Sequence, residues 1–428
     1  MDDLGLYILT ANCAQNLIDV DLFAAHLFDA LASDAGGSEI APIAYSFLGG
    51  SYLTPYFDAF VQAVKKAATK NWDESYVNVL RDHTGMTGLM VFARADLAGK
   101  ISWIDTAHVG FGLHEMGNKG AVGARVGYRV DSSKTVDFTF VAAHLAPMEG
   151  ALQQRNLNWQ SIVERLVFSG DEAPLQSQSS ADESTALLRD QEPSHQAEGL
   201  RRDVFAPNTY LFLAGDLNYR TSDVSPLKDD VSRFPRRDVS RDSPSHYSHL
   251  LQKDQLGREM RQGKSFHGLS EAPIDFAPTY KYSDSARQAA RTGVDSDAEW
   301  KWSSHRWPSW CDRILYLDTS SGDNKRVRPH VYDALPLLPQ SDHRPVALAV
   351  SVPLGVSQSP TDQPTNAIAA PFAIDPHWRS RRDAARRKEL VVGVLAYLGL
   401  TWEGNGLLLA STLGIVGAWV ALQNLWSM

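Results

Sequence analysis

The chain has 428 residues, enough for one large domain or two of average size, and 43% of them are hydrophobic, which is ample for a substantial core. Its formal net charge is -9, whereas a protein that tracks a nucleic acid duplex normally carries a basic footprint, so nucleic acid is not an expected partner. The chain has only two cysteines, without metal-ligand spacing, which fits a reducing compartment.

Most of the chain carries the apolar patterns of strands and helices. The run Leu4–Thr10 predicts a buried strand that ends just before Asn12. Apolar residues recur at helical spacing in three segments, which predicts amphipathic helices near residues 16–32, 57–64 and 159–166. Alternation predicts a strand that ends at His144, and continuous apolar runs predict strands covered on both faces at residues 210–214, 314–317 and 346–350. Reactive side chains adjoin these strands, so the pattern places chemistry at one rim of a sandwich.

Two segments are too polar to contribute to a core. Residues 169–202 are rich in Ser, Gln, Glu and Asp, which is typical of a disordered surface insertion. Residues 355–377 combine prolines with Ser, Thr and Gln, which is typical of a linker. The chain therefore divides into a domain at residues 1–354, the linker, a basic segment at 378–389 and a hydrophobic tail at 390–428.

The tail has the composition of a membrane anchor. The basic segment contains RSRRDAARRK, Leu390–Leu400 is apolar but short, and Leu407–Trp426 runs without a charge. A membrane-spanning helix needs about 20 apolar residues, so the second run predicts a C-terminal membrane helix, whereas a buried core helix would have no core to join. The basic segment would lie on the cytosolic side and favour anionic headgroups. The endoplasmic reticulum is the expected location, and entry of Leu390–Leu400 into the bilayer stays open.

Four short motifs supply the residues that carry chemistry. They are GDLNYR at Gly215–Arg220, PTYKY at Pro278–Tyr282, PSWCDRIL at Pro308–Leu315 and SDHRPV at Ser341–Val346. Together they contain carboxylates, an amide, a histidine and cations. A phosphate monoester repels a nucleophile, so its hydrolysis needs a cation that screens the charge and a base that activates water. The motifs therefore predict metal-assisted attack of water on a phosphate ester.

With GNKGAV at Gly117–Val122 and AAHLAPMEG at Ala142–Gly150, these motifs resemble the inositol polyphosphate 5-phosphatases, a branch of the endonuclease/exonuclease/phosphatase superfamily. The resemblance runs from about Leu4 to about Leu354. It implies an α/β (α+β) fold, a four-layered sandwich of two packed, mostly antiparallel sheets flanked by helices, to which the membrane helix is added. It also implies a Mg²⁺-dependent phosphomonoesterase that acts on the inositol ring.

The resemblance assigns a metal region and a residue that handles water. Asn12, Glu39 and Asp342 match the metal-region residues, and Mg²⁺ prefers such oxygen ligands, although a strand-ending Asn is also a common turn residue. Asp216 is the candidate general base, or the carboxylate that orients the attacking water. Asn218, two positions on, lies on the same side of an extended segment and can donate to phosphate oxygens.

Two histidines are expected to face the phosphate. His343 is the candidate for binding and neutralising it, aligned through its other ring nitrogen by Asp312, and its protonation would supply charge to the transition state. His144, in a strand-then-HL context, resembles the second active-site histidine of the family.

The resemblance places substrate selection in residues set back from the metal. Tyr280, Lys281 and Arg306 are expected to contact the neighbouring 4-phosphate, while Asn118 and Lys119 are expected to line the pocket entrance. The family often has a lysine two residues before the arginine, where this chain has Ser304. One cationic contact is therefore missing, and a lower affinity for the 4-phosphate is expected.

The chain departs from the family pattern before Glu39. The family normally has an apolar strand that ends in Gln-Glu, and its Glu is the principal metal ligand. Here the segment Ser33–Ser38 contains no apolar run, and EIAPIAYSFLGG resembles the family segment that comes after that strand. The sequence therefore predicts that an interior strand is absent. Either nearby residues re-register to replace it, or the chain is a truncated or mispredicted variant.

The leading hypothesis is a monomeric, tail-anchored and cytosol-facing phosphatase that converts phosphatidylinositol 4,5-bisphosphate to phosphatidylinositol 4-phosphate with Mg²⁺. The first alternative is a membrane-tethered phosphoinositide-binding protein with weak or no turnover, because the strand before Glu39 is missing. The second is another phosphodiesterase of the superfamily, a nuclease or a sphingomyelinase, against which PTYKY and WCDRIL weigh. The choice between lipids and free inositol phosphates, and the acceptance of 3-phosphorylated lipids, stay open.

Overall fold

A computed structural model describes the chain except for residues 1–2, 15, 32–39, 47–52, 113–114, 116, 118, 133, 170–172, 175–201, 208, 238, 292–299, 318–325, 355–368 and 427–428. Two compact units emerge, one from Met1 to Trp378 and one from Arg379 to Met428.

The strands are β1 (Asp3–Asn12), β2 (Ile40–Ser46), β3 (Tyr76–Thr84), β4 (Thr87–Arg94), β5 (Ile101–Phe111), β6 (Lys119–Arg129), β7 (Thr135–His144), β8 (Ala173–Pro174), β9 (Thr209–Asp216), β10 (Leu269–Glu271), β11 (Asp312–Leu317), β12 (Arg328–Ala334) and β13 (Val346–Pro353). The α-helices of the first unit are α1 (Val20–His26), α2 (Thr54–Trp72), α3 (Leu152–Arg165), α4 (Tyr247–Leu251), α5 (Gln255–Arg261) and α6 (Asp284–Ala290).

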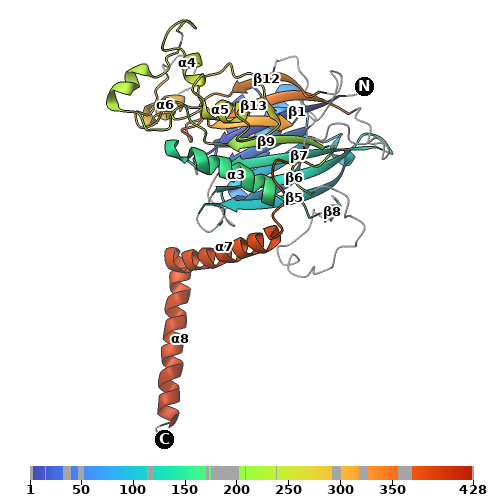
Figure 1. Cartoon of the computed structure of the whole chain (residues 1–428). Coiled ribbons are helices and arrows are strands. Elements are labelled where there is room, and N and C mark those ends of the chain that lie inside the picture. The colour runs from blue at the N-terminus through green and yellow to red at the C-terminus, as the bar shows by residue number, and fades with distance from the viewer. Residues whose placement is uncertain are drawn as a thin grey trace. The chain divides into compact units, whose positions relative to one another are not determined.

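The strands of the first unit form two sheets (Figure 1). One has the order β12-β13-β1-β2-β4-β3 and the other the order β10-β11-β9-β7-β6-β5-β8. Neighbouring strands run antiparallel except β1 with β2 and β7 with β9. The expected sandwich of two mostly antiparallel sheets is therefore confirmed.

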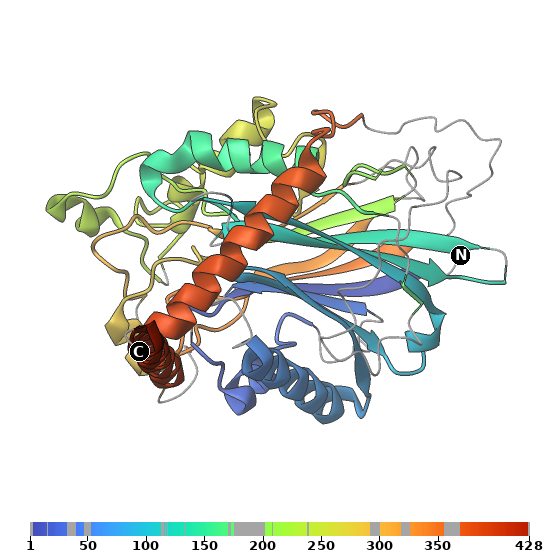
Figure 2. The same ribbon diagram turned by 90° about the horizontal axis from the view of Figure 1, so that it is seen from below.

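Alternation along the strands divides the apolar side chains among three layers of packing. In β1, Leu6 and Ile8 face the core between the sheets, whereas Tyr7 and Leu9 pack outward against α1 and α2. On the outer face of the other sheet, Trp159 of α3 belongs to a third buried cluster. Figure 2 shows the two sheets with these helices on opposite sides. The four layers follow from the need to cover both faces of each sheet.

The predicted helix at residues 16–32 is shorter in the structure. It begins after Asp19, whose carboxylate accepts hydrogen bonds from the backbone nitrogens of Asp21 and Leu22. Such an N-cap satisfies amide groups that the first helical turn leaves without partners. The helix α1 ends at His26, and turns follow.

The predicted loss of an interior strand is wrong. The segment Ile40–Ser46 forms β2, which pairs in parallel with β1 and antiparallel with β4, so this sheet has no gap between them. Ser46 lies beside Asn12, and Ile40 lies beside Leu6 near the other end of β1. The first of the two sequence readings, re-registration of nearby residues, therefore holds. Glu39 itself lies outside the described residues.

The predicted linker ends in a packed segment. Within the described part of residues 355–377, Phe372 lies edge-on against His267 and packs on the cluster around α3. The backbone nitrogen of Asp375 donates to the carbonyl oxygen of Glu164 at 2.9 Å. The first unit thus includes residues up to Trp378 rather than ending at Leu354. The predicted insertion at residues 169–202 lies largely outside the described residues, and its Ala173–Pro174 forms β8 beside β5.

The second unit contains two helices, α7 (Trp378–Leu400) and α8 (Trp402–Trp426). The basic segment and the first apolar run, which the sequence separated, form the single helix α7. Among the described residues, neither helix by itself combines the length and hydropathy of a membrane crossing. The two helices do so only when taken together, with a bend of 85° at their junction. The structure therefore does not show the single membrane-spanning helix predicted from the sequence.

Candidate active site

Strand ends from both sheets bring polar side chains to one rim. Asn12 ends β1, His144 ends β7 and Asp216 ends β9. Asp312 begins β11, which runs antiparallel to β9 and pairs Asp312 directly with Asp216. Parallel pairing of β7 with β9 likewise sets His144 beside Asp216. The predicted gathering of reactive residues at one rim is confirmed.

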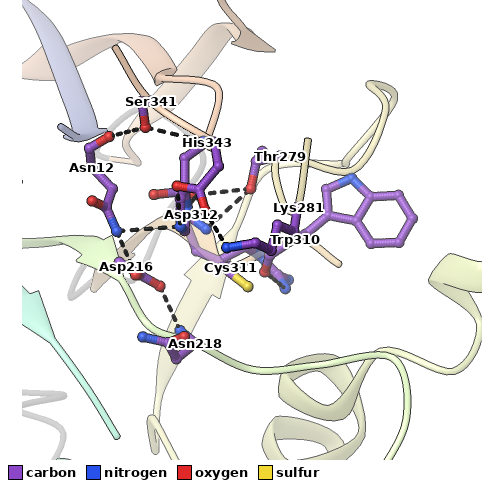
Figure 3. A network of polar contacts seen from close by, with 12 residues as sticks. Asn12, Asp216, Asn218, Thr279, Lys281, Trp310, Cys311, Asp312, Ser341 and His343 are labelled. Atoms are coloured by element: carbon purple, nitrogen blue, oxygen red, sulfur yellow. Dashed lines mark hydrogen bonds and ion pairs between the residues drawn. The ribbon is translucent and has the colours of Figure 1, made fainter. Parts of the chain in front are cut away.

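Asp216 contacts several members of this cluster, and Figure 3 shows its contacts with Asn12 and Asn218. Its Oδ2 accepts from Asn12 Nδ2 at 2.9 Å and lies 3.2 Å from His144 Nε2. Its Oδ1 accepts from the backbone nitrogen of Asn218 at 3.1 Å. Burial alone would raise the pKa of Asp216, but His144, His343 and Lys119 hold that pKa well below its usual range. Asp216 is therefore ionised at neutral pH.

His343 forms a buried pair with Asp312. The ring Nδ1 lies 2.8 Å from Asp312 Oδ2, which also accepts from Thr279 Oγ1 at 2.8 Å. Burial opposes charge on the imidazole, but the carboxylates of Asp312 and Asp216 outweigh it and raise the pKa of His343 to about 9. The imidazole is therefore charged at neutral pH, in the orientation predicted from the sequence.

The second ring nitrogen of His343 remains available to a ligand. Its Nε2 lies 3.3 Å from Asn12 Nδ2, and once both nitrogens carry protons neither can accept from the other. The amide oxygen of Asn12 instead accepts from the backbone nitrogen of Ala14 at 2.9 Å. A phosphate oxygen is the kind of acceptor that a proton on His343 Nε2 could meet.

His144 and Lys119 form a second side of the site. Lys119 begins β6, and its Nζ contacts His144 Nε2. Burial lowers the pKa of His144 more than Asp216 raises it, so this histidine is neutral at neutral pH. In a neutral ring, Nε2 either carries a proton and donates to Asp216 or lacks it and accepts from Lys119. Only one of these two contacts can therefore be a hydrogen bond at a time. Burial also lowers the pKa of Lys119, against the opposing effect of Asp216.

The rim has the donors that a hard cation requires. Carboxylate oxygens of Asp216 and Asp312 lie within 4.8 Å of each other and of a ring nitrogen of His343, although the charged imidazole itself cannot coordinate a cation. Asp312 Oδ1 is buried and has no hydrogen-bond partner among the described residues, so one carboxylate oxygen is left for another ligand. The third carboxylate, Asp342, has Oδ1 3.9 Å from His343 Nε2. Clustered carboxylate oxygens fit Mg²⁺ or Ca²⁺.

Residues 10–349 match the family described as Endonuclease/Exonuclease/phosphatase family 2. The chain belongs to this family. Among its curated relatives, the type I inositol polyphosphate 5-phosphatase 13 of Arabidopsis thaliana is 32% identical over 61% of this chain and 22% of its own length. The polyphosphatidylinositol phosphatase INP53 of Saccharomyces cerevisiae is 29% identical over 65% of this chain and 20% of its own length. The chain thus spans about a fifth of the length of these relatives.

Two solved structures are similar to this chain in architecture. The inositol polyphosphate 5-phosphatase domain of SpSynaptojanin, in complex with inositol (1,4)-bisphosphate and calcium ion, aligns with a TM-score of 0.58 at 20% identity. The alignment covers 92% of this chain and 93% of that domain. A Cimex nitrophorin, a ferrous NO complex, aligns with a TM-score of 0.50 at 18% identity over 82% of this chain and 98% of its own. These likenesses show the fold alone, and function depends on the residues of the site.

The residues of this family member that were predicted to bind substrate occupy two places. Tyr280 packs its ring on His343, with centroids 4.5 Å apart, and Lys281 Nζ contacts Asp342 Oδ2 at 2.5 Å. Arg306 has other partners, with Nη1 3.4 Å from Ser225 Oγ and Nε 3.6 Å from Glu149 Oε1. The predicted Asn118 lies outside the described residues, as does Glu39 of the predicted metal set.

The predicted metal set differs from the residues that the rim offers. Asn12 directs its amide nitrogen, rather than its oxygen, toward Asp216 and His343. Asp342 has one carboxylate oxygen engaged by Lys281. Asp312, which the sequence assigned only to aligning His343, contributes the unpaired oxygen. Asp312 therefore has a buried oxygen at the rim that could meet a cation, whereas both oxygens of Asp216 already accept hydrogen bonds.

Sequence reasoning gave no role to Arg220, which the structure places beneath the site. Its guanidinium donates to the backbone oxygen of Asn218 at 3.0 Å and to Asn218 Oδ1, and lies 4.4 Å from the centroid of the Tyr280 ring. Arg220 thus connects the strand-end loop of β9 to the residue stacked on His343. Its position in GDLNYR was the signal that the sequence offered, and the structure adds that this arginine is 2% exposed and has buried partners.

Proposed function

We propose that this protein is a Mg²⁺-dependent phosphoinositide 5-phosphatase that converts phosphatidylinositol 4,5-bisphosphate to phosphatidylinositol 4-phosphate. The observation that supports this proposal most directly is the buried rim, where ionised Asp216 lies beside a charged His343 that Asp312 orients. The names of the curated relatives support the inositol phosphate class of substrate.

The cationic and anionic side chains of the site would have different roles in hydrolysis. His343 would donate from Nε2 to a phosphate oxygen, while Asp312 keeps the imidazole in that orientation. Lys119 would add a second positive charge from the side of His144. Asp216 and Asp312 would hold Mg²⁺, which when bound screens the phosphate charge and lowers the pKa of a water.

Asp216 is better suited to orienting the attacking water than to accepting a proton from that water. A general base is most effective when its pKa lies near the working pH, and the pKa of Asp216 is held far below that. An ionised carboxylate with Oδ1 and Oδ2 already fixed by Asn218 and Asn12 can accept a hydrogen bond from water in one direction. Of the two sequence-based roles for Asp216, orientation of the attacking water is therefore favoured.

Exposed apolar side chains near Arg306 favour a lipid over a free inositol phosphate. Arg306 Nη2 lies 3.4 Å from Met148 Sδ, and its Nη1 contacts Ser225, the neighbour of Val224. Met148 is 52% exposed, Val224 69% and Leu227 74%. Apolar side chains at the edge of a polar site suit a substrate whose headgroup is joined to acyl chains.

Phosphate release from phosphatidylinositol 4,5-bisphosphate vesicles, with and without Mg²⁺, tests this function. Wild-type protein should release phosphate only with the metal, and lipid chromatography should identify the 4-phosphate as the product. Asp216→Asn should reduce the rate by about a thousandfold, whereas Asp229→Asn at an exposed site should not. Formation of the 5-phosphate instead would overturn the proposed regiochemistry.

A second candidate is a membrane-tethered phosphoinositide-binding protein without turnover. Ser46 ends β2 in register with Asn12, and the sequence has a serine rather than an acidic residue at this strand end. Asp342 is also engaged by Lys281. Normal lipid binding without phosphate release at any Mg²⁺ concentration would favour this candidate.

We also propose that the second unit attaches the protein to the cytosolic face of a membrane, with the endoplasmic reticulum as the expected location. Large apolar side chains of α8 are exposed, among them Leu409, Leu413 and Ile415. Imaging and fractionation of the fluorescently tagged full chain test the location. A chain that stays in the cytosol would contradict it.

A further inference from the structure

The junction of α7 and α8 is built by side chains. Thr401 lies between the helices, and its Oγ1 donates to the carbonyl oxygen of Tyr397 at 2.6 Å. The same Oγ1 accepts from the backbone nitrogen of Gly404 at 3.0 Å. Thr401 therefore closes the last turn of α7 and caps the first turn of α8. We call Thr401–Asn405 the corner.

Gly404 makes the sharp bend sterically possible. A Cβ at this position would lie 2.0 Å from the carbonyl oxygen of Tyr397 and 2.6 Å from Leu398 Cα. These are backbone atoms, which cannot rotate away. By contrast, a Cβ at Gly399 or Gly406 would meet nothing within 4 Å. The bend of 85° thus depends on one glycine among the three.

A straight arrangement of these helices would not match a bilayer. They have 23 and 25 residues, so end to end they would extend about 70 Å at roughly 1.5 Å per residue. The hydrocarbon of a bilayer is only about 30 Å thick. A straight path would bring either Glu403 into hydrocarbon or the apolar run Leu390–Leu400 into water, and both are unfavourable.

The corner has the composition of a membrane interface. Trp402 is 88% exposed and stands next to Glu403, and Asn405 follows. Tryptophan and polar residues concentrate at the level of the headgroups. The first half of α7 carries the cations Arg379, Arg381, Arg382, Arg386, Arg387 and Lys388. Their charge is complementary to that of anionic lipids.

We propose that α7 lies along the surface of an anionic membrane, that the corner lies at headgroup level, and that α8 inserts its apolar length from there. This inference rests on the proposed membrane attachment and adds the orientation of each helix. Figure 1 shows the two helices meeting at the corner. In this arrangement Glu403 stays near water, and the cations of α7 stay near lipid phosphates.

Depth measurements on the full chain bound to phosphatidylcholine/phosphatidylserine vesicles test the orientation. Nitroxide labels on single introduced cysteines would report depth through accessibility to oxygen and to a polar nickel reagent. Val391, Leu395 and Leu398 share one face of α7, so their depths should agree. Leu409, Leu413 and Val416 share one face of α8, and their depth should change by about 10 Å over the seven positions. A comparable slope along α7 would overturn the proposal.

A pair of glycine variants tests the corner itself. In Gly404→Ala, the depth of the labels should change along α7, because the new methyl group displaces the backbone of Tyr397 and opens the bend. In Gly406→Ala, the label depths along α7 and α8 should stay as in the wild type. Equal profiles in the two variants would contradict a role for the corner.

Reversing charges on α7 tests whether anionic lipids bind this helix, separately from whether the second unit attaches to a membrane at all. Arg386→Glu with Arg387→Glu should reduce binding to vesicles with phosphatidylserine at least tenfold and leave binding to pure phosphatidylcholine unchanged. Equal binding of wild type to both vesicles would contradict the anionic partner. No binding to either would overturn attachment as well, while leaving phosphatase activity on dispersed substrate intact.

Discussion

Burial acts against charge at both Asp216 and His343, yet both are ionised. Desolvation favours the neutral form of each group. His144, His343 and Lys119 hold the pKa of Asp216 below its usual range, and the carboxylates of Asp312 and Asp216 raise the pKa of His343 to about 9. The two charges therefore stabilise each other within a buried site, as a reaction on a charged ester requires.

The raised pKa of His343 predicts a pH-dependent stability. Its ordinary pKa is 6.5 and its folded pKa about 9, so the stabilisation is fully present below pH 6.5 and is lost as pH rises through 9. In EDTA, the difference in unfolding free energy between wild type and His343→Gln should shrink by at most about 3 kcal/mol over that range. Urea unfolding measures it, and exposed His305→Gln should show no such change.

Arg220 is predicted to position Asn218 rather than to touch substrate. Arg220→Lys retains the charge but cannot reach both oxygens of Asn218 in the same fork. We expect kcat to fall on the order of tenfold to a hundredfold with KM little changed, since only alignment is lost. Arg236→Lys at an exposed site is the control, and a rise in KM alone would contradict the positioning role.

At the scale of elements, β2 shows how context selects a strand. Pro42 lacks a backbone donor and argues against an interior strand, yet β2 lies between β1 and β4. Register pairs with β1 are present at Ile40 and Ile43 and absent between them, where Pro42 stands. The sheet thus accommodates the proline by giving up pairing on one side.

The interior position of β2 predicts a large effect at Ile43. This side chain is 1% exposed in the cluster beneath α1 and α2, so Ile43→Ala should lower the unfolding free energy by about 2–5 kcal/mol. Val77→Ala, at a 44% exposed position of β3, should cost under about 1 kcal/mol. Urea unfolding compares the two, and equal effects would contradict an interior strand.

The loop after β9 is predicted to contact lipid during turnover. Val224→Asp should reduce hydrolysis of vesicle lipid about tenfold, because a side chain that would be buried in the interface becomes charged. Hydrolysis of a short-chain, water-dispersed substrate should be unchanged. Leu157→Asp, at a 51% exposed site on α3, is the control for added charge. Equal loss on both substrates would contradict a role in lipid contact.

For the whole molecule, the boundary of the first unit lies beyond the expected one. A chain that ends at residue 354 lacks Phe372 and the contact of Asp375 with Glu164. It should unfold with a free energy about 1–3 kcal/mol lower than a chain that ends at residue 378. Urea unfolding of the two truncated chains measures this, and equal stability would show that residues 369–377 contribute nothing.

Most members of the site could be predicted from the sequence because each lies in a local motif that adjoins an apolar run. Asp216, Asp312 and His343 belong to such motifs, and strand ends in a sandwich converge on a rim. Roles that depend on partners could not be predicted. Asn12 and Asp216 are 204 residues apart, and no local pattern shows which atom of an amide faces the carboxylate.

The order of residues along the chain was thus sufficient for the family, the two sheets and the inventory of reactive groups, since these follow from short-range periodicity and motifs. Tertiary structure decided the rest. It filled the interior of a sheet with β2, gave Arg220 its partners and set the bend between α7 and α8. Each of these depends on distant or sterically exacting contacts, because register and close backbone approach are settled only when the elements pack together.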